Sequence, residues 1–237
     1  MENRYLKKTN MLNYDAESIK NLINEMGWRG LDEYERIGAI YDYVRNDILF
    51  GYNSSDLLTA EEVLRDGYGH CNTKATLLLS LFRATGIPCR LHGSKVSKEF
   101  QKGATSGIIS LLAPETIIHT WVEVLYDGDW INLEGVITDD AYIEAVRKTY
   151  GNVSGPFSKY AISVPDLAKL SLDWCGKDTF VQHESMVKDY GVFDDPDTFF
   201  DIYHQTFGKI KNLAYVYYGR KKMIRNVNKM RSCISPS

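Results

Sequence analysis

A cysteine, a histidine and a carboxylate are placed in this chain so that they can act together on a carbonyl group. Cys71 follows Gly67 and Gly69 and begins an apolar run that Gly86 and Pro88 end, so we expect Cys71 in the first turn of a helix. There, unpaired N–H groups and the positive end of the helix dipole favour a thiolate over a thiol. The alternative interpretation is a small buried cysteine in a core helix.

The histidine and the carboxylate belong to a predicted β-hairpin. Strand-forming stretches flank the turn Asp127-Gly128, and this turn fixes which residues pair. The pairing places His119 and Glu134 diagonally on one face, within reach of a long side chain. Glu123 shares the face but lies roughly 13 Å from His119 along the strand, so Glu134 is the predicted partner. A His–Glu pair that only stabilises the sheet is the alternative.

Alternation along the hairpin divides its side chains between two faces. The face expected to meet the core is mostly apolar and carries Thr120, Val122, Val124, Tyr126, Ile131 and Leu133. The opposite face is polar and aromatic, as is typical of a cleft wall, and carries His119, Trp121, Glu123, Leu125, Trp130, Asn132 and Glu134.

These residue types suit the attack of a thiol on an amide. The thiolate attacks the carbonyl carbon, the histidine moves the proton to the leaving amine, and the acid orients the imidazole. The Cys71 N–H is the first expected donor to the oxyanion, and Tyr52 or Asn53 is the expected second donor. Trp121 and His70 complete the predicted substrate-binding residues. Consecutive residues usually point apart, so we expect little effect of His70 on the thiol.

Helix signals precede this region, and a loop interrupts it. Residues 15–26 form an amphipathic pattern, Asp32 and Thr59 are N-cap candidates, and each is followed three residues later by a glutamate. A short strand is predicted over 89–93 and a long loop over 94–116, which could serve as a lid over the substrate.

The composition is that of an ordinary globular protein. Of the 237 residues, 25% are charged, the formal net charge is −3, and the four cysteines have no metal-ligand spacing. The sequence contains no recognisable leader, membrane-spanning run, metal motif or cofactor motif. We therefore expect a cytoplasmic protein with reduced thiols, no cofactor and no metal.

Charge is distributed unevenly. From residue 209 to the end there are eight basic residues and no acidic one, which leaves −11 on the first 208 residues. The simple interpretation is a solvated basic face that complements an acidic body. The alternative is an anionic partner, either a surface or a nucleic acid.

Taken together, these segments resemble the transglutaminase-like superfamily. The resemblance covers roughly residues 35–138 and rests on the order and spacing of Gly69-His70-Cys71, the run from Leu81 to Arg90, and His119-Thr120-Trp121. It implies a papain-like α+β core in which a helix carrying the cysteine packs on an antiparallel sheet, with helical additions at both ends. It also implies Cys71 as nucleophile, His119 as base and Glu134 as third member, where the family usually has aspartate.

Two domains and one activity are therefore predicted. Residues 1–140 form the core with its N-terminal helices, and residues 141–237 form a mostly helical extension that packs on the core and is basic after residue 208. The predicted activity is hydrolysis of peptide or protein amides through a cysteine acyl-thioester. Acyl transfer to an amine and an inactive peptide-binding module are the alternatives.

Overall fold

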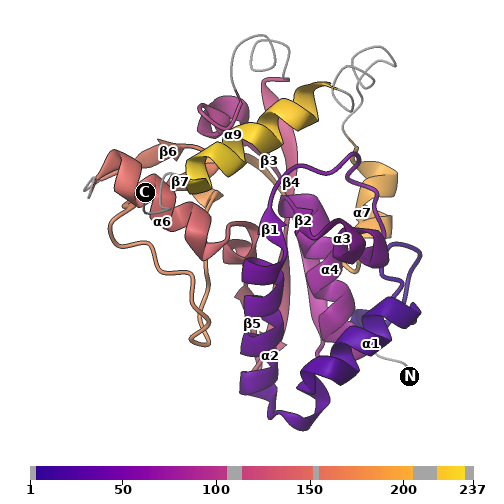
Figure 1. The fold of residues 1–237 in the computed structure, drawn as a ribbon. Coiled ribbons are helices and arrows are strands. Elements are labelled where there is room, and N and C mark those ends of the chain that lie inside the picture. Colours follow the sequence, from indigo (N-terminus) through magenta and orange to yellow (C-terminus); the bar gives the residue numbers. More distant parts are fainter. Residues whose placement is uncertain (1–3, 106–113, 152–154, 205–217, 233–237) are drawn as a thin grey trace.

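The computed structural model describes residues 4–105, 114–151, 155–204 and 218–232 (Figure 1). Its α-helices are α1 (Glu17–Met26), α2 (Glu33–Asp42), α3 (Ala60–Asp66), α4 (Cys71–Ala84), α6 (Asp140–Tyr150), α7 (Pro196–Ile202) and α9 (Arg220–Ser232). Its strands are β1 (Leu49–Phe50), β2 (Tyr68–Gly69), β3 (Cys89–Ser97), β4 (Thr116–Tyr126), β5 (Asp129–Asn132), β6 (Phe157–Lys159), β7 (Ile162–Val164) and β8 (Met186–Phe193).

Capping residues mark three boundaries of the N-terminal helices. The Asp32 side chain accepts the N–H of Glu35 at the start of α2, and Thr59 forms a capping box with Glu62 at the start of α3. Gly27 ends α1 in the left-handed conformation, with φ 66°. The two predicted N-caps, Asp32 and Thr59, are confirmed.

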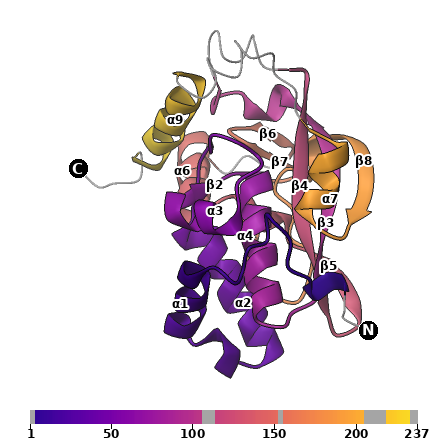
Figure 2. The ribbon, with the colours of Figure 1, turned by 90° about the vertical axis from the view of Figure 1, so that its right-hand side faces the viewer.

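Helix α4 is the centre of the molecule, and Cys71 is its first residue. Every residue from Asn72 to Arg83 is buried. The helix lies between α2 and α3 on one side and the sheet on the other (Figure 2). A helix enclosed all round keeps its N-terminus in a fixed place, and the thiol of Cys71 is fixed with it.

The main sheet is antiparallel and has the strand order β5-β4-β3-β8. The predicted turn at Asp127-Gly128 is confirmed, because Tyr126 pairs with Asp129. Two bounds differ from the predictions. Strand β3 continues through residues 94–97, which the sequence assigned to a loop. Strand β5 ends at Asn132 instead of continuing to Glu134.

The chain after residue 140 contributes to the sheet, although the sequence indicated a mostly helical extension. Strand β8 pairs with β3 as the edge strand of the main sheet, while β6 and β7 form a small hairpin. Helices α6, α7 and α9 are also present in this part of the chain. The predicted lid falls partly on residues 106–113, which lie outside the described residues. The division at residue 140 stays a prediction.

The predicted α+β architecture is confirmed, with the cysteine-bearing helix packed on an antiparallel sheet. Across the described ranges, every helix falls short of the length and apolar character that a membrane crossing requires.

Candidate active site

The site begins at the N-terminus of α4, where the Cys71 thiol is half-buried. His70 is the N-cap residue, and its N–H donates to the Thr73 hydroxyl at 3.0 Å. As the first residue of the helix, Cys71 has an N–H with no acceptor inside the helix. That N–H is free to donate to an oxyanion that forms next to the sulfur.

His119 and Glu134 form the buried pair that the hairpin register predicts. His119 Nε2 lies 2.7 Å from Glu134 Oε1, and the two side chains are 1% and 0% exposed. Glu134 reaches the imidazole from a 3₁₀ turn, Glu134–Ile137, that follows β5 directly. Because a carboxylate can only accept, Nε2 carries the proton of this hydrogen bond and Nδ1 is the ring nitrogen left for the thiol.

The second oxygen of Glu134 is held by the C-terminal part of the chain, a contact that the sequence analysis missed. Glu134 Oε2 accepts the backbone N–H of Val181 at 2.7 Å and that of Gln182 at 2.9 Å. Backbone donors leave no side-chain motif, and the region from 157 to 190 has no clear periodicity. The acid is therefore bound on both sides, which fixes its orientation toward His119.

Asn72 connects the start of α4 to the strand that carries His119, and it too was missed. Its Nδ2 donates to the carbonyl of Ile118 at 3.4 Å, and its Oδ1 accepts from the Thr120 hydroxyl at 3.0 Å. Ile118 and Thr120 are the neighbours of His119 on β4. One buried amide thus sets the distance between the helix that carries the thiol and the strand that carries the imidazole.

The electrostatics of the site favour a thiolate–imidazolium pair. Burial raises the pKa of Cys71, but the charges and hydrogen bonds of His119 and His70 outweigh burial and lower this pKa to about 6. Burial lowers the pKa of His119, but the Cys71 thiolate and Glu134 raise it to about 10. Burial also raises the pKa of Glu134, and its bonds to His119 and to the 181–182 backbone more than reverse this effect.

His70 lies closer to the thiol than predicted. Its Nδ1 is 3.9 Å from Cys71 Sγ, and its Nε2 is 3.5 Å from Asp56 Oδ1. Burial lowers the pKa of His70, but the thiolate and Asp56 raise it above its usual value. The expectation that consecutive side chains point apart is wrong here, because an N-cap residue leaves the regular helix geometry; its φ is −117° and its ψ is −171°.

The two candidates for a second oxyanion donor have different surroundings. Asn53 is 0% exposed, and its Nδ2 donates to Asp66 and to the carbonyl of Tyr68 at 2.9 and 3.0 Å. Both amide hydrogens are thus used within the protein, and the role of Asn53 as a substrate donor stays a prediction. Tyr52 stacks on His70, with 6.2 Å between ring centroids, and stays a predicted substrate-binding residue.

The predicted cleft face of the hairpin is covered, so Trp121 is only 2% exposed. Its indole N–H donates to Asn132 Oδ1 at 2.7 Å, and its ring contacts His119 at 5.6 Å and His183 at 6.2 Å between centroids. Residues 178–183, a segment that the sequence left unassigned, lie over this face through bonds to Asn132 and Glu134. The indole of Trp121 thus packs beside the imidazole of His119, and its role in substrate binding stays a prediction.

Other reactive groups lie outside this cluster. Glu123 binds His92 and Arg90, at 2.6 Å from each, and is separate from His119, as predicted. The other free thiols of the described ranges are Cys89, which is buried, and Cys175, which is exposed. In the same ranges, no three His, Cys, Asp or Glu side chains are grouped so that they could hold a metal ion.

Comparisons with known proteins find similarity to a family model and to solved structures. Residues 20–135 match the family model of the transglutaminase-like superfamily. A crystal structure of a putative cysteine protease from Cytophaga hutchinsonii aligns at 17% sequence identity with a TM-score of 0.46, covering 81% of this chain and 47% of that one. This chain thus spans about half the length of that protein. No curated protein matches the chain.

Proposed function

Because residues 20–135 belong to the transglutaminase-like superfamily, a family of cysteine-dependent enzymes, we propose that this protein cleaves amide bonds through an acyl-thioester on Cys71. One observation carries the proposal. The half-buried Cys71 thiol stands at the N-terminus of α4, and the buried His119 that lowers the pKa of this thiol is held by Glu134 at 2.7 Å. A pKa of about 6 for Cys71 and of about 10 for His119 favours the thiolate and the protonated imidazole at neutral pH.

The reaction follows from the positions of the groups. The Cys71 sulfur forms a bond to the amide carbonyl carbon while the carbonyl π electrons move to oxygen, and the Cys71 N–H donates to that oxygen. His119 then gives its proton to the leaving amine as the C–N bond breaks, and the acyl-thioester remains. Glu134 stabilises the imidazolium before this step and orients the neutral imidazole after it.

Hydrolysis completes the proposed cycle. Water gives up a proton to His119 as its oxygen attacks the thioester carbonyl, and the sulfur leaves as a thiolate. Bulk water is always available, so hydrolysis is the default outcome unless a bound amine competes for the thioester. We therefore propose a peptidase or amidase, with acyl transfer to an amine as the alternative that the same intermediate permits.

The proposal is tested by trapping the intermediate. The full chain is mixed with a library of peptide amides, and intact-mass spectrometry followed by peptide mapping locates the acyl group. We expect an acyl adduct on Cys71, a carboxylic acid product, and loss of about 10⁴-fold or more in rate for Cys71→Ala. A matched control, Cys175→Ala, removes an exposed thiol and is expected to keep full activity.

Two outcomes separate the alternatives. If an added primary amine is incorporated in preference to water, the enzyme is an acyltransferase and the hydrolytic assignment is wrong. If turnover of the library persists in Cys71→Ala, the thiol mechanism is wrong.

A further inference from the structure

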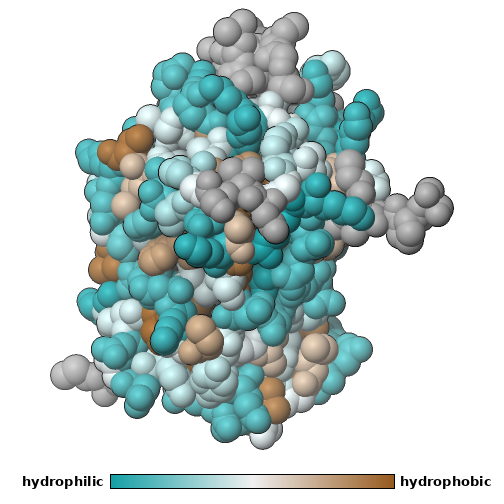
Figure 3. Space-filling view, turned by 90° about the vertical axis from the view of Figure 1, so that its left-hand side faces the viewer, coloured by the Kyte–Doolittle hydropathy of each residue, from teal (hydrophilic) through white to brown (hydrophobic). Residues whose placement is uncertain are grey.

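Helix α9 presents one apolar face to the protein and one basic face to solvent. Met223, Val227 and Met230 are buried, and Asn226 Nδ2 bonds to the carbonyl of Ala104 at 3.0 Å. On the opposite side, the basic residues Lys221 and Arg225 are exposed, and the half-buried Lys222 lies at the border between the two faces. We call these three residues the basic face of α9. Figure 3 shows the side of the molecule on which α6 lies, where hydrophilic residues predominate.

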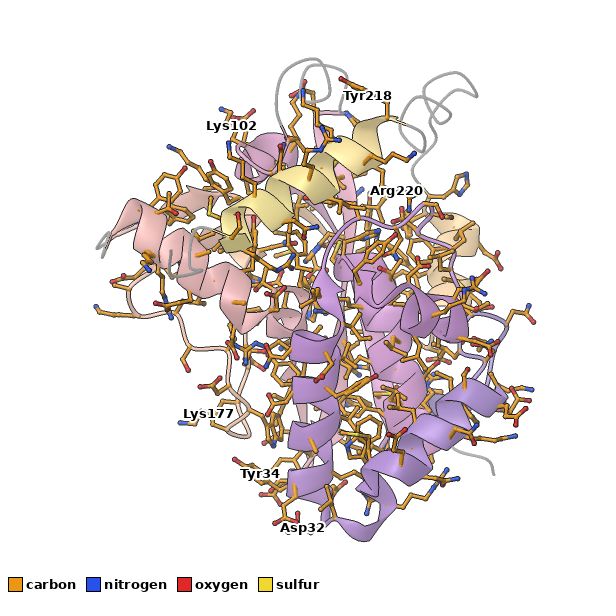
Figure 4. All side chains as sticks on the ribbon, viewed as in Figure 1. Asp32, Tyr34, Lys102, Lys177, Tyr218 and Arg220 are labelled. Atoms are coloured by element: carbon orange, nitrogen blue, oxygen red, sulfur yellow. The ribbon has the colours of Figure 1, made fainter. Side chains whose placement is uncertain are left out.

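Both ends of α9 are fixed to segments that lead to Cys71. At the first residue of the helix, Arg220 Nη1 donates to the Tyr68 hydroxyl at 3.1 Å, and Tyr68 belongs to β2, just before Cys71 (Figure 4). At the other end, Arg231 Nη2 donates to the carbonyl of Phe50 at 2.7 Å and Arg231 pairs with Asp139.

The segment 50–52, to which Arg231 bonds, is connected to the Cys71 thiol by a series of ring contacts. Phe50 contacts Tyr52 at 5.5 Å between centroids, Tyr52 stacks on His70, and His70 lies beside Cys71. The two ends of α9 are therefore bonded to segments that precede or contact Cys71.

The positive charges of this face are not neutralised by the described part of the protein. Of the basic residues of α9, Arg231 has an acidic partner, Asp139, whereas Lys221, Lys222 and Arg225 form no ion pair within the described ranges. Residues 106–113 and 205–217 contain no Asp or Glu in the sequence. The acidic part of the body thus pairs with Arg231, whereas within the described residues Lys221, Lys222 and Arg225 are left to solvent or to a partner.

We propose that the basic face of α9 binds an acidic stretch of the polypeptide substrate whose amide bond reaches Cys71. This inference rests on the proposed amide chemistry, since it names the class of substrate for that site. Lys221 and Arg225 are one turn apart, about 6 Å along the helix. Alternate side chains of an extended peptide are spaced by about 6.6 Å, so carboxylates at alternate positions match the two cations.

A polypeptide fits this surface better than a nucleic acid or a membrane. The basic face is one short helical stripe, and a single extended chain can contact it and also enter the site beside it. Charge pairs of this exposed kind guide association and select partners, and salt weakens them.

The experiment measures binding without catalysis. The full chain carrying Cys71→Ala is titrated, at low and high salt, with a fluorescent peptide of alternating Glu and Ala and with a neutral peptide of alternating Gln and Ala. The test variant adds Lys221→Ala, Lys222→Ala and Arg225→Ala. The matched control adds Lys20→Ala, Lys169→Ala and Lys177→Ala, which remove the same charge from exposed positions; Lys177 lies well away from α9 (Figure 4).

We expect salt-sensitive binding of the acidic peptide, weakened about 10-fold or more in the α9 variant and less than about 2-fold in the control. Equal affinity of the α9 variant, or tighter binding of poly(U) RNA or of phosphatidylserine vesicles, would overturn the inference. Because the readout needs no chemistry, binding without acylation would mean that only the proposed function fails. If the parent protein forms the acyl adduct, but the α9 variant binds the acidic peptide as tightly as its Cys71→Ala background, only the proposed docking surface fails.

Discussion

Glu134 stands where the superfamily that residues 20–135 match usually has aspartate, and its contacts explain the longer side chain. The carboxylate reaches His119 with one oxygen and the 181–182 backbone with the other. It does so from a 3₁₀ turn and not from a strand, because β5 ends at Asn132. Glutamate is one methylene longer than aspartate. From the 3₁₀ turn, this length lets the carboxylate reach both His119 and the backbone N–H groups of residues 181–182.

Glu134→Gln tests this role. The glutamine oxygen can still accept the two backbone N–H groups, so we expect the fold to persist. Its NH₂ would then face His119, which removes the charge that stabilises the imidazolium and favours the wrong tautomer. We expect kcat to fall by about 10²- to 10⁴-fold, measured by steady-state kinetics on the best substrate of the library.

Glu123→Gln is the matched control. Glu123 is a buried carboxylate on the same face of β4 as His119, but it bonds to Arg90 and His92. It is expected to change kcat by less than about 3-fold. Equal losses in the two variants would show that Glu134 contributes only to stability.

At the residue scale, the sequence predicted the contacts that depend on register. Strand alternation and the Asp127-Gly128 turn were enough to choose Glu134 over Glu123 as the partner of His119. It did not predict Asn72 or the backbone donors of Glu134, because both contacts join segments far apart in the chain. It also did not predict that Asn53 and Trp121 are buried and hydrogen-bonded within the protein.

At the scale of elements, Gly93 is the point where β3 allows α7 to pack closely. A Cβ added at Gly93 would lie 2.2 Å from a ring carbon of Phe199 and 2.7 Å from the next, closer than atoms can approach. Phe199 is fully buried and packs in turn on Phe193 of β8. The glycine thus lets one aromatic ring join β3, β8 and α7.

Gly93→Ala is therefore expected to destabilise the protein by about 1–3 kcal/mol, because the ring must move in a close-packed core. Urea unfolding followed by far-UV circular dichroism measures the change. Gly30→Ala is the control, since a Cβ there meets nothing within 4 Å, and it is expected to be neutral or slightly stabilising. A Gly93→Ala protein as stable as the parent would contradict this packing.

Elements with local signals were predicted well, and elements without them were not. The caps Asp32 and Thr59 act through side chains a few residues away, so the sequence shows them directly. Strand β8 has no such signal. As an edge strand it exposes or half-exposes every residue from Met186 to Phe193, and it therefore lacks the apolar alternation of a buried strand.

At the scale of the whole molecule, the C-terminal part completes the site that the matched family region begins. The family match ends at residue 135, yet the donors that hold Glu134 are at 181 and 182. Helix α9, whose first residue Arg220 bonds to Tyr68 just before Cys71, begins later still. The family pattern therefore predicted the chemistry of the core, whereas the parts that orient the acid and border the site lie beyond it.

The central claim is an activated thiolate at Cys71, and its most direct test is the pH dependence of alkylation. Iodoacetamide reacts with the thiolate only, and peptide mapping isolates the Cys71 signal in a Cys175→Ala, Cys233→Ala background. Cys71 has a pKa lowered to about 6 and His119 a pKa raised to about 10, so the ion pair forms above the first value and is lost above the second. We expect the alkylation rate to rise with a midpoint near pH 6.

In His119→Ala, the midpoint is expected to move up toward the ordinary value of about 8.5, because the main positive charge that lowers the thiol pKa is gone. Circular dichroism confirms that the variant is folded. A midpoint near 8.5 in the parent protein, unchanged by His119→Ala, would contradict the account.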